Sequence, residues 1–186
     1  MNETLKHIRE RFACRSFTNE TPTPEQLNAI AQAAIQSPSG MNRQSWHISV
    51  VEDKALIAEI EEEGIQVINA TNEMLAQRIA SRNNTMFYNA PCVIFLATKV
   101  PDVAGSELID LGIISQNVVI AATSLGLGSL HCGLAAFAFA GDKKEYFKKK
   151  LSFPEGYEPG IAVLIGYASA KQQPHEPDQS KITYIR

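Results

Sequence analysis

Two uninterrupted apolar segments dominate the pattern of hydrophobic and polar positions along the chain. Residues 92–98 read CVIFLAT and residues 161–167 read IAVLIGY, and both are rich in residues that favour strands. Continuous apolar runs of this length predict strands that are buried on both faces, at the centre of a sheet. Residues 46–51 (WHISVV) predict a further strand, and residues 129–132 a short one. The polar tail ends in another strand-like segment at residues 182–185.

Apolar residues at helical spacing predict helices around these strands. The clearest helix start is at residues 23–26 (TPEQ), where Thr23 can cap the helix, proline takes the first position and Gln26 can complete a capping box. Because helices and strands alternate, we expect an α+β fold with helices over a central sheet. The expected helices cover residues 2–11, 24–35, 53–63, 65–88, 105–125 and 142–151.

Composition places the chain among packed globular proteins. Of its 186 residues, 45% are hydrophobic and 20% are charged, which excludes a wholly disordered or collagen-like chain. That length is typical of one domain, so residues 1–186 are expected to form a single domain. The net charge of −3 argues against general nucleic-acid binding, which needs a basic surface.

The cysteines and the N-terminus bear on the compartment. Cys14, Cys92 and Cys132 are widely spaced and form no CxxC or CxxH pair, so we expect neither a metal site nor a disulfide framework. Free thiols predict a reducing cytoplasm. Residues 1–16 lack the apolar core of a signal peptide, and residues 108–134 are too polar for a membrane span.

The first group of residues that could carry chemistry is Arg11-Phe12-Ala13-Cys14-Arg15. Its two arginines are four residues apart near the end of the first expected helix, a spacing that lets both converge on one anion. Arginine forks suit phosphate in particular. The alternative is that both arginines are solvated or pair with Glu10 and Glu20.

A second group, residues 37–47 (SPSGMNRQSWH), joins a helix to a strand. It is dense in amide and hydroxyl side chains, and its proline and glycine restrict the backbone. Such a loop can present several hydrogen bonds to a flat polar heterocycle, and the alternative is an ordinary turn. His47 is interpreted as structural.

The third group is residues 126–133 (GLGSLHCG). Its small residues permit a ligand to approach the backbone closely, and the alternative is tight packing of a helix on the sheet. His131 and Cys132 are neighbours without a visible activating partner, so they do not predict a nucleophile and its base. The sequence contains no GxGxxG after the first strand, no Walker motif and no GxSxG elbow.

Taken together, these segments resemble the nitroreductase family of FMN-dependent oxidoreductases over nearly the whole chain. Residues 11–17 look like the family's N-terminal arginine motif, which grips the FMN phosphate. Residues 37–46 are the most specific match, because they are similar to the family's Ser-Pro-Ser-x-x-Asn-x-Gln-Pro-Trp segment. Further matches are Ala90-Pro91 before a buried strand, residues 125–133 and the strand at residues 161–167.

This chain departs from the family pattern at three positions. Ala13 stands where the family usually has serine, and Ser45 replaces a proline. Met86 stands where many members have a lysine near the flavin pyrimidine, and Arg82 and Arg15 are the candidates to supply that charge instead.

The resemblance implies FMN-binding residues in every one of these segments. No side chain is expected to act as a catalytic acid or base, because flavin N5 carries the chemistry and a backbone N–H near residues 131–133 would bond to it. No metal is expected. The implied FMN contacts are Arg11, Phe12, Ala13, Arg15, Pro38, Ser39, Gly40, Asn42, Gln44, Asn83, His131, Cys132, Gly133 and Lys181.

The resemblance also implies an architecture and a reaction. The fold would be a three-layer sandwich of helices around a mainly antiparallel sheet, in an intertwined homodimer with FMN at the interface. Hydride would pass from NAD(P)H through flavin N5 to a nitroaromatic, quinone or enone by a ping-pong mechanism. No membrane or nucleic-acid partner is expected. The alternatives are a flavin-binding or storage protein without turnover, a flavin reductase or dehydrogenase for one metabolite, and a structural domain that binds no flavin.

Overall fold

A four-stranded antiparallel sheet forms the centre of the structure, a computed structural model that describes residues 2–100 and 105–186. The two inner strands are the two uninterrupted apolar segments of the sequence, so the prediction of central buried strands is confirmed. The order is β1-β2-β4-β3, with β1 at Trp46–Val51, β2 at Cys92–Lys99, β3 at Gly128–Cys132 and β4 at Tyr157–Gly166.

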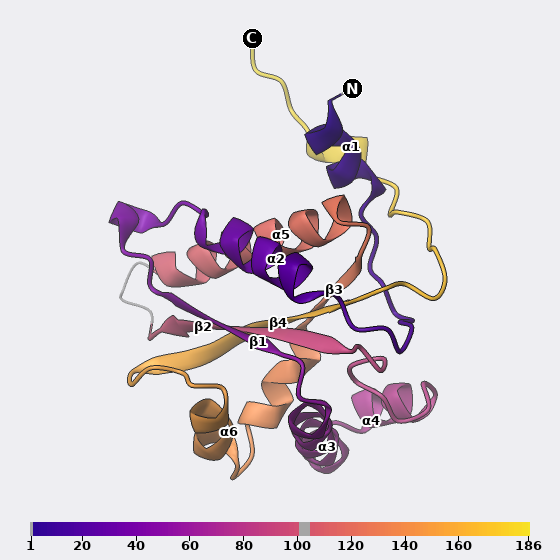
Figure 1. Ribbon diagram of the computed structural model, residues 1–186, viewed down its shortest axis with the longest axis vertical. Coiled ribbons are helices and arrows are strands. Elements are labelled where there is room, and N and C mark those ends of the chain that lie inside the picture. Colours follow the sequence, from indigo (N-terminus) through magenta and orange to yellow (C-terminus); the bar gives the residue numbers. More distant parts are fainter. Residues whose placement is uncertain (1, 101–104) are drawn as a thin grey trace.

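Helices cover both faces of this sheet, which confirms the expected α+β class (Figure 1). On one face lie α2 (Pro24–Ile35) and α5 (Ser106–Ser124), and on the other lie α3 (Lys54–Thr71), α4 (Glu73–Ala80) and α6 (Lys144–Lys150). Helix α1 (Glu3–Glu10) lies outside the layers, at the end where the chain also terminates. None of the helices described is long and apolar enough to cross a membrane. Three short 3₁₀ helices are η1 (Gly40–Asn42), η2 (Gly133–Phe139) and η3 (Gln179–Lys181).

The central strand β2 contributes to two hydrophobic cores, one on each face of the sheet. Ile94 and Leu96 pack in the core formed with α2 and α5, while Val93 and Phe95 pack in the core formed with α3, η2 and α6. Successive side chains of a strand point to opposite faces, so a strand covered on both sides must be apolar throughout. This is why the pattern of β2 is continuous instead of alternating.

The start of α2 carries the capping box predicted from the sequence. The Thr23 hydroxyl accepts from the Gln26 amide at 3.3 Å, and the Gln26 side chain accepts from the Thr23 amide at 2.9 Å. Replacing Thr23 by alanine is expected to lower the free energy of unfolding by about 1 kcal/mol, because one helix N–H loses its partner. Urea denaturation measures this, and Thr23→Ser should retain most of the stability. Equal stability of Thr23→Ala and wild type would contradict the cap.

The predicted break between the helices at residues 53–63 and 65–88 is wrong. Helix α3 continues through Gly64 to Thr71, and the chain breaks at Asn72, whose side chain caps α4 by accepting from the Leu75 amide at 3.0 Å. Gly64 serves packing: a Cβ there would lie 2.8 Å from the Met86 Cε. Helix α4 also ends earlier than predicted, at Ala80.

Neither Arg11 nor Arg15 lies on a helix, although the predicted first helix included Arg11 and placed Arg15 just beyond its end. Helix α1 ends at Glu10, and the chain from Arg11 to Arg15 forms no helical turn but pairs with β3 at Ala13. A non-helical chain carries residues four apart further from each other than a helical turn would. The two arginines are therefore separated more widely than helical spacing would give, because pairing with β3 replaces the last turn of the helix.

Two further differences concern the C-terminal third of the chain. Strand β4 begins at Tyr157, four residues before the apolar run, and the register with β2 shifts opposite Pro159 and Ile161. A bulge at this point accommodates a proline, which lacks a ladder N–H. The strand predicted at residues 182–185 does not form, since this segment is exposed and pairs with no strand of the described chain.

Candidate functional site

One cavity, called here the β3 cavity, brings several predicted site residues together. It has a volume of about 200 Å³ and lies where the non-helical N-terminal segment, α4, the turn after α4 and the end of β3 meet. Arg15 and residues 131–133, which the sequence predicts as FMN contacts, line it. The other lining residues are Leu75, Arg78, Ile79, Arg82, Met86, Tyr88, Leu130 and Leu134.

Backbone pairing explains why Arg15 lies beside the end of β3. Ala13 forms an isolated parallel bridge with Ser129, and the Cys14 amide donates to the Ser129 carbonyl at 2.9 Å. The segment thus continues the sheet beyond its edge strand, which satisfies backbone groups that would otherwise be exposed. It holds the base of the Arg15 side chain at the cavity.

The glycine-rich segment has features that fit both of the interpretations that the sequence left open. A Cβ at Gly128 would lie 2.8 Å from the Cys14 Sγ, so glycine is needed there for packing. A Cβ at Gly133 would meet no atom of the described chain within 4 Å, although Gly133 lines the cavity. Packing therefore does not require glycine at this position, and its backbone is open to a ligand.

Three guanidinium groups line the β3 cavity, from Arg15, Arg78 and Arg82. None of the three forms an ion pair with a carboxylate of the described chain. The Arg82 Nη1 donates to the Tyr88 hydroxyl at 2.6 Å, and its guanidinium carbon lies 5.8 Å from the centre of the Tyr88 ring. The cavity is therefore strongly cationic in a chain whose net charge is −3.

The two titratable groups at the end of β3 are held neutral. Burial lowers the pKa of His131, a hydrogen bond to the Ser115 backbone opposes this, and the charge of Arg11 lowers it further. Burial raises the pKa of the Cys132 thiol to about 11. A neutral thiol is a poor nucleophile, so this geometry agrees with the interpretation that no nucleophile–base pair acts here.

The turn after α4, residues 81–89, is held by one carboxylate from α3. The Glu61 Oε1 accepts from the backbone amides of Met86 and Phe87, both at 2.6 Å, and from the Thr85 hydroxyl at 2.8 Å. The backbone of Tyr88 has a φ of 53°, a left-handed conformation that is costly for an aromatic residue. The Glu61 carboxylate therefore stabilises a turn that the local sequence does not favour.

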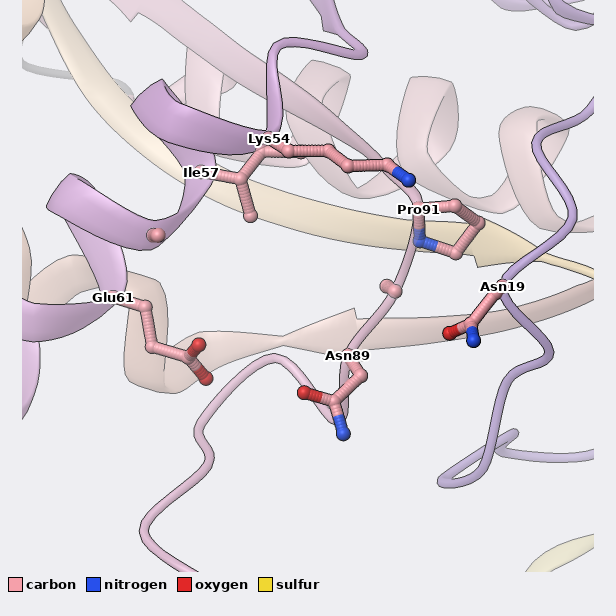
Figure 2. A pocket seen from close by; sticks show the side chains of 8 residues that line it. Asn19, Lys54, Ile57, Glu61, Asn89 and Pro91 are labelled. Atoms are coloured by element: carbon pink, nitrogen blue, oxygen red, sulfur yellow. The ribbon is translucent and has the colours of Figure 1, made fainter.

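Glu61 also borders a second cavity of about 220 Å³, called here the α3 cavity (Figure 2). Its carboxylate and the Asn89 amide face the same space, Lys54 lies along the upper rim and Asn19 approaches from the N-terminal segment. No predicted site residue lines this cavity. Its link to the β3 cavity is the turn that Glu61 holds.

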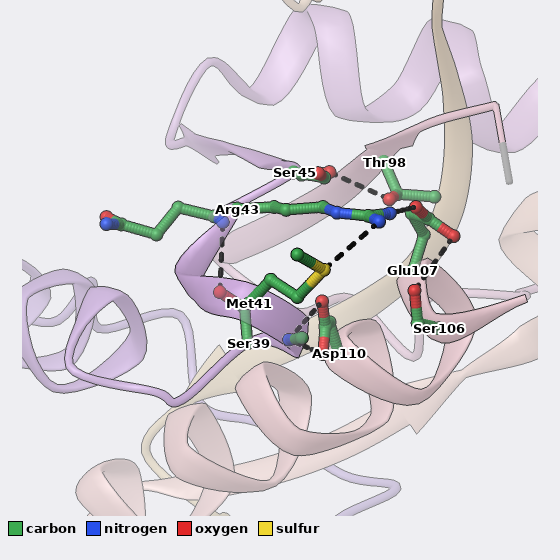
Figure 3. Close-up of polar contacts among 10 residues, drawn as sticks. Ser39, Met41, Arg43, Ser45, Thr98, Ser106, Glu107 and Asp110 are labelled. Atoms are coloured by element: carbon green, nitrogen blue, oxygen red, sulfur yellow. Dashed lines mark hydrogen bonds and ion pairs between the residues drawn. The ribbon is translucent and has the colours of Figure 1, made fainter. Parts of the chain in front are cut away.

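The amide-rich loop at residues 37–45 is fixed by the first turns of α5 (Figure 3). The Gly40 amide donates to the two carboxylate oxygens of Asp110 at 3.1 and 3.3 Å, and Arg43 pairs with Glu107 at 3.3 Å. Both acids are buried although they lie on the most apolar helix. Their position on the inner side of α5 is explained by this loop, which they hold against the helix.

This loop has an unusual backbone. Met41, Asn42 and Gln44 have φ values of 53°, 54° and 49°, and the Gln44 amide donates to the Ser39 hydroxyl at 2.9 Å. Residues held in the left-handed region cost free energy and persist where the surrounding structure over-determines them, often at binding sites. An ordinary turn does not need three of them, so the binding interpretation is favoured.

Within one chain, however, this loop does not reach the β3 cavity. It precedes β1, at one edge of the sheet, whereas the cavity lies at β3, the opposite edge. Three strand spacings separate these edges, about 14 Å. The predicted contacts that do not line the cavity are Pro38, Ser39, Gly40, Asn42 and Gln44 in the loop, Arg11, Phe12 and Ala13 before Arg15, Asn83 in the turn, and Lys181 in η3.

Among charged residues, the sequence analysis did not indicate Arg78, which lines the β3 cavity, or Glu61, which holds the adjacent turn, and Arg82 was considered only as a substitute. Arg78 was missed because one arginine on the exposed side of a short helix has the same pattern as a solvated residue. Glu61 was missed because its partners are backbone amides of another segment. Arg82 was considered only as a replacement for the family lysine at Met86, and its spacing of four residues from Arg78 was the usable signal.

Comparison with known proteins identifies the family. The model of the nitroreductase family matches residues 8–167. A nitroreductase with bound FMN from Desulfitobacterium hafniense is 48% identical, with a TM-score of 0.96 and full coverage of both chains. An FMN-dependent nitroreductase from Clostridium difficile is 25% identical, with a TM-score of 0.83 over 99% of both chains.

A relative from Bacillus subtilis, named as an FMN reductase using NAD(P)H, is 29% identical over 100% of this chain and 76% of its own length. The FMN and NAD(P)H in these names agree with the cofactors that the sequence implied. The family match extends from the last turn of α1 to just beyond the end of β4. Because the family match covers residues 8–167 and the fold is shared along the whole chain, the protein belongs to the nitroreductase family of oxidoreductases.

Proposed function

We propose that this protein binds FMN non-covalently and transfers hydride from NAD(P)H to a nitroaromatic, quinone or enone acceptor. The observation that carries the proposal is the β3 cavity, where guanidinium groups and an open glycine backbone flank an apolar wall. Close relatives are named for FMN or carry it bound, which supports the same cofactor here. Residues 1–186 would act as one FMN-binding domain in the cytoplasm.

The residues of the β3 cavity suit a flavin in three respects. Leu75, Ile79 and Leu134 offer apolar contacts to a flat ring, and the Arg15 guanidinium offers charge-assisted hydrogen bonds to its polar edge. The Gly133 backbone is open to the cavity. When bound there, FMN would supply the redox chemistry at N5, while the protein would orient it and exclude water.

A second copy of the chain would complete the site. The left-handed loop and the β3 cavity lie at opposite edges of the sheet in one chain, so one cofactor touching both is best explained by two chains that contribute one part each. Helix α5 supports this, because Leu108 and Ile109 face outward with exposures of 59% and 66% while Glu107 is buried. Helix α1 adds an exposed apolar pair, Leu5 and Ile8.

Absorbance and sedimentation test the function together. We expect the purified protein to be yellow, with one FMN per chain released by heat, and to sediment as a dimer at micromolar concentration. NAD(P)H should bleach the flavin band, and double-reciprocal plots with a quinone should be parallel, because both substrates would use the same flavin face. Bound FMN without NAD(P)H oxidation would indicate a flavin-binding protein, and a colourless monomer would contradict the proposal.

A further inference from the structure

We propose that the acceptor reduced at this site carries an anionic group, such as an aromatic carboxylate, which Arg78 and Arg82 bind. This inference rests on the proposed function and names the substrate class of the same cavity. Its basis is that three arginines line the β3 cavity, and only one of them, Arg15, is a predicted flavin contact. Arg78 and Arg82 are additional. Both lie on one side of the cavity, in α4 and in the turn that follows it.

The two arginines are arranged to act together. Arg78 is in the last turn of α4, and Arg82 follows four residues later. Arg82 is positioned by its 2.6 Å hydrogen bond to the Tyr88 hydroxyl, and its other guanidinium N–H groups have no hydrogen-bond partner among the described residues, so they can bind a ligand. The Tyr88 ring that carries this hydroxyl is positioned by the turn after α4, in which Tyr88 has a left-handed backbone. A strained turn that positions a cation at a cavity is typical of a binding site.

Local electrostatics leave this pair without compensation. The acid on the same helix, Glu73, hydrogen-bonds to Gln77, and neither Arg78 nor Arg82 forms an ion pair within the described chain. Unpaired guanidinium groups at the rim of a low-dielectric cavity attract anions. A structural alternative exists for Arg78, since basic residues also stabilise the C-terminal end of a helix. That role would not discriminate among substrates.

The apolar residues of the same cavity define the rest of the ligand. Leu75 and Ile79 lie on α4 with Arg78, and Leu130 of β3 and Leu134 of η2 line the same cavity. An aromatic acceptor would stack on the flavin that these side chains contact, with its anionic substituent at the arginines. The 2′-phosphate of NADPH offers similar chemistry, so the experiment must separate the acceptor from the hydride donor.

The test compares 4-nitrobenzoate with the neutral 4-nitrobenzamide as acceptors, using FMN-loaded wild type and Arg78→Gln. Loss of one charge-assisted contact should lower the benzoate-to-benzamide ratio of kcat/KM by about ten- to a hundredfold. Arg78→Lys, which retains charge without the fork, should recover part of the ratio. Lys149→Gln, an exposed lysine on α6 outside the cavity, changes net charge equally and should leave the ratio unchanged.

Two parallel measurements separate this inference from the function on which it rests. Calorimetric titration of the oxidised protein with 4-nitrobenzoate should show the same loss of affinity in Arg78→Gln, without any turnover. Equal losses for both acceptors, an unchanged ratio, or an equally large loss of FMN affinity would overturn the proposal. A loss confined to NADPH relative to NADH would overturn it in favour of the hydride donor. A wild-type protein that binds FMN but reduces neither these two acceptors nor a quinone or an enone would refute the proposed function instead.

Discussion

Replacing Arg15 by alanine is expected to weaken FMN binding by about ten- to a hundredfold, because a charge-assisted hydrogen bond contributes roughly 1.5–3 kcal/mol. Arg15 lines the β3 cavity with the apolar residues that would contact a flavin ring. It reaches the cavity from a segment anchored to β3 by the Ala13–Ser129 bridge. The side chain can therefore be removed without disturbing the backbone that positions it.

The non-helical backbone between Arg11 and Arg15 changes which part of FMN each should contact. A non-helical chain carries residues four apart further from each other than a helical turn would, so the two guanidinium groups suit different parts of an elongated ligand better than one phosphate. We expect Arg15→Ala to weaken FMN and riboflavin alike, because Arg15 lies in the cavity with the apolar wall. Arg11→Ala should weaken FMN and leave riboflavin nearly unaffected, since riboflavin lacks the phosphate.

Quenching of flavin fluorescence measures these affinities in both variants. Lys149→Ala is the control for net charge. The Arg11 effect should diminish as salt rises, because a partly exposed phosphate contact is screened. An Arg15→Ala loss confined to FMN would show that both arginines converge on the phosphate, as helical spacing first suggested. No loss in either variant would mean that both are solvated.

The sequence predicts the inner strands because burial on two faces leaves an unmistakable pattern. Each position of β2 from residue 92 to 98 is buried, so no alternation of exposed polar residues interrupts the run. The beginning of β4 was missed because Pro159 and Gly160 normally end strands, and only pairing with β2 through a bulge tolerates them there. Here the pairing with β2, which is distant in the sequence, outweighs the local tendency of Pro159 and Gly160 to end a strand.

Helix boundaries show the same limit. Gly64 looked like the end of one helix, yet its lack of a side chain serves contact with Met86, a residue of a distant segment. The actual boundary at Asn72 uses ordinary capping chemistry, which a search for Asn before an apolar helix could have found. The capping box at Thr23 was predictable because all of its atoms lie within four residues.

The candidate site was predictable only in parts. Arg15 and residues 131–133 could be named from motifs, but their meeting depends on the bridge between Ala13 and Ser129, which no local pattern indicates. The buried acid Asp110 was visible as a carboxylate in an apolar helix, but its role became apparent only with the Gly40 amide at 3.1 Å. Separation of the loop from the cavity follows from strand order alone.

Replacing Glu61 by alanine is expected to lower the free energy of unfolding by about 3 kcal/mol, because a carboxylate that accepts three hydrogen bonds is lost. Two of its donors are the Met86 and Phe87 backbone amides, which would be left without a partner beside a buried strand. Glu61→Gln retains a neutral acceptor oxygen and should lose about half as much. Urea denaturation at one fixed FMN concentration measures the change, since bound ligand adds to apparent stability.

The neighbouring Glu62 provides a matched control. It is exposed, and its hydrogen bond within the described chain is accepted from the Gln66 side chain at 3.3 Å, so Glu62→Ala should change stability by less than about 0.5 kcal/mol. Because Glu61 holds the turn whose Met86 and Tyr88 line the cavity, Glu61→Ala should also weaken FMN binding, although Glu61 does not line the β3 cavity itself. If Glu61→Ala were as stable as Glu62→Ala, the turn would be held by its own sequence. If it lost stability but bound FMN like wild type, the position of the turn would not matter to the cofactor.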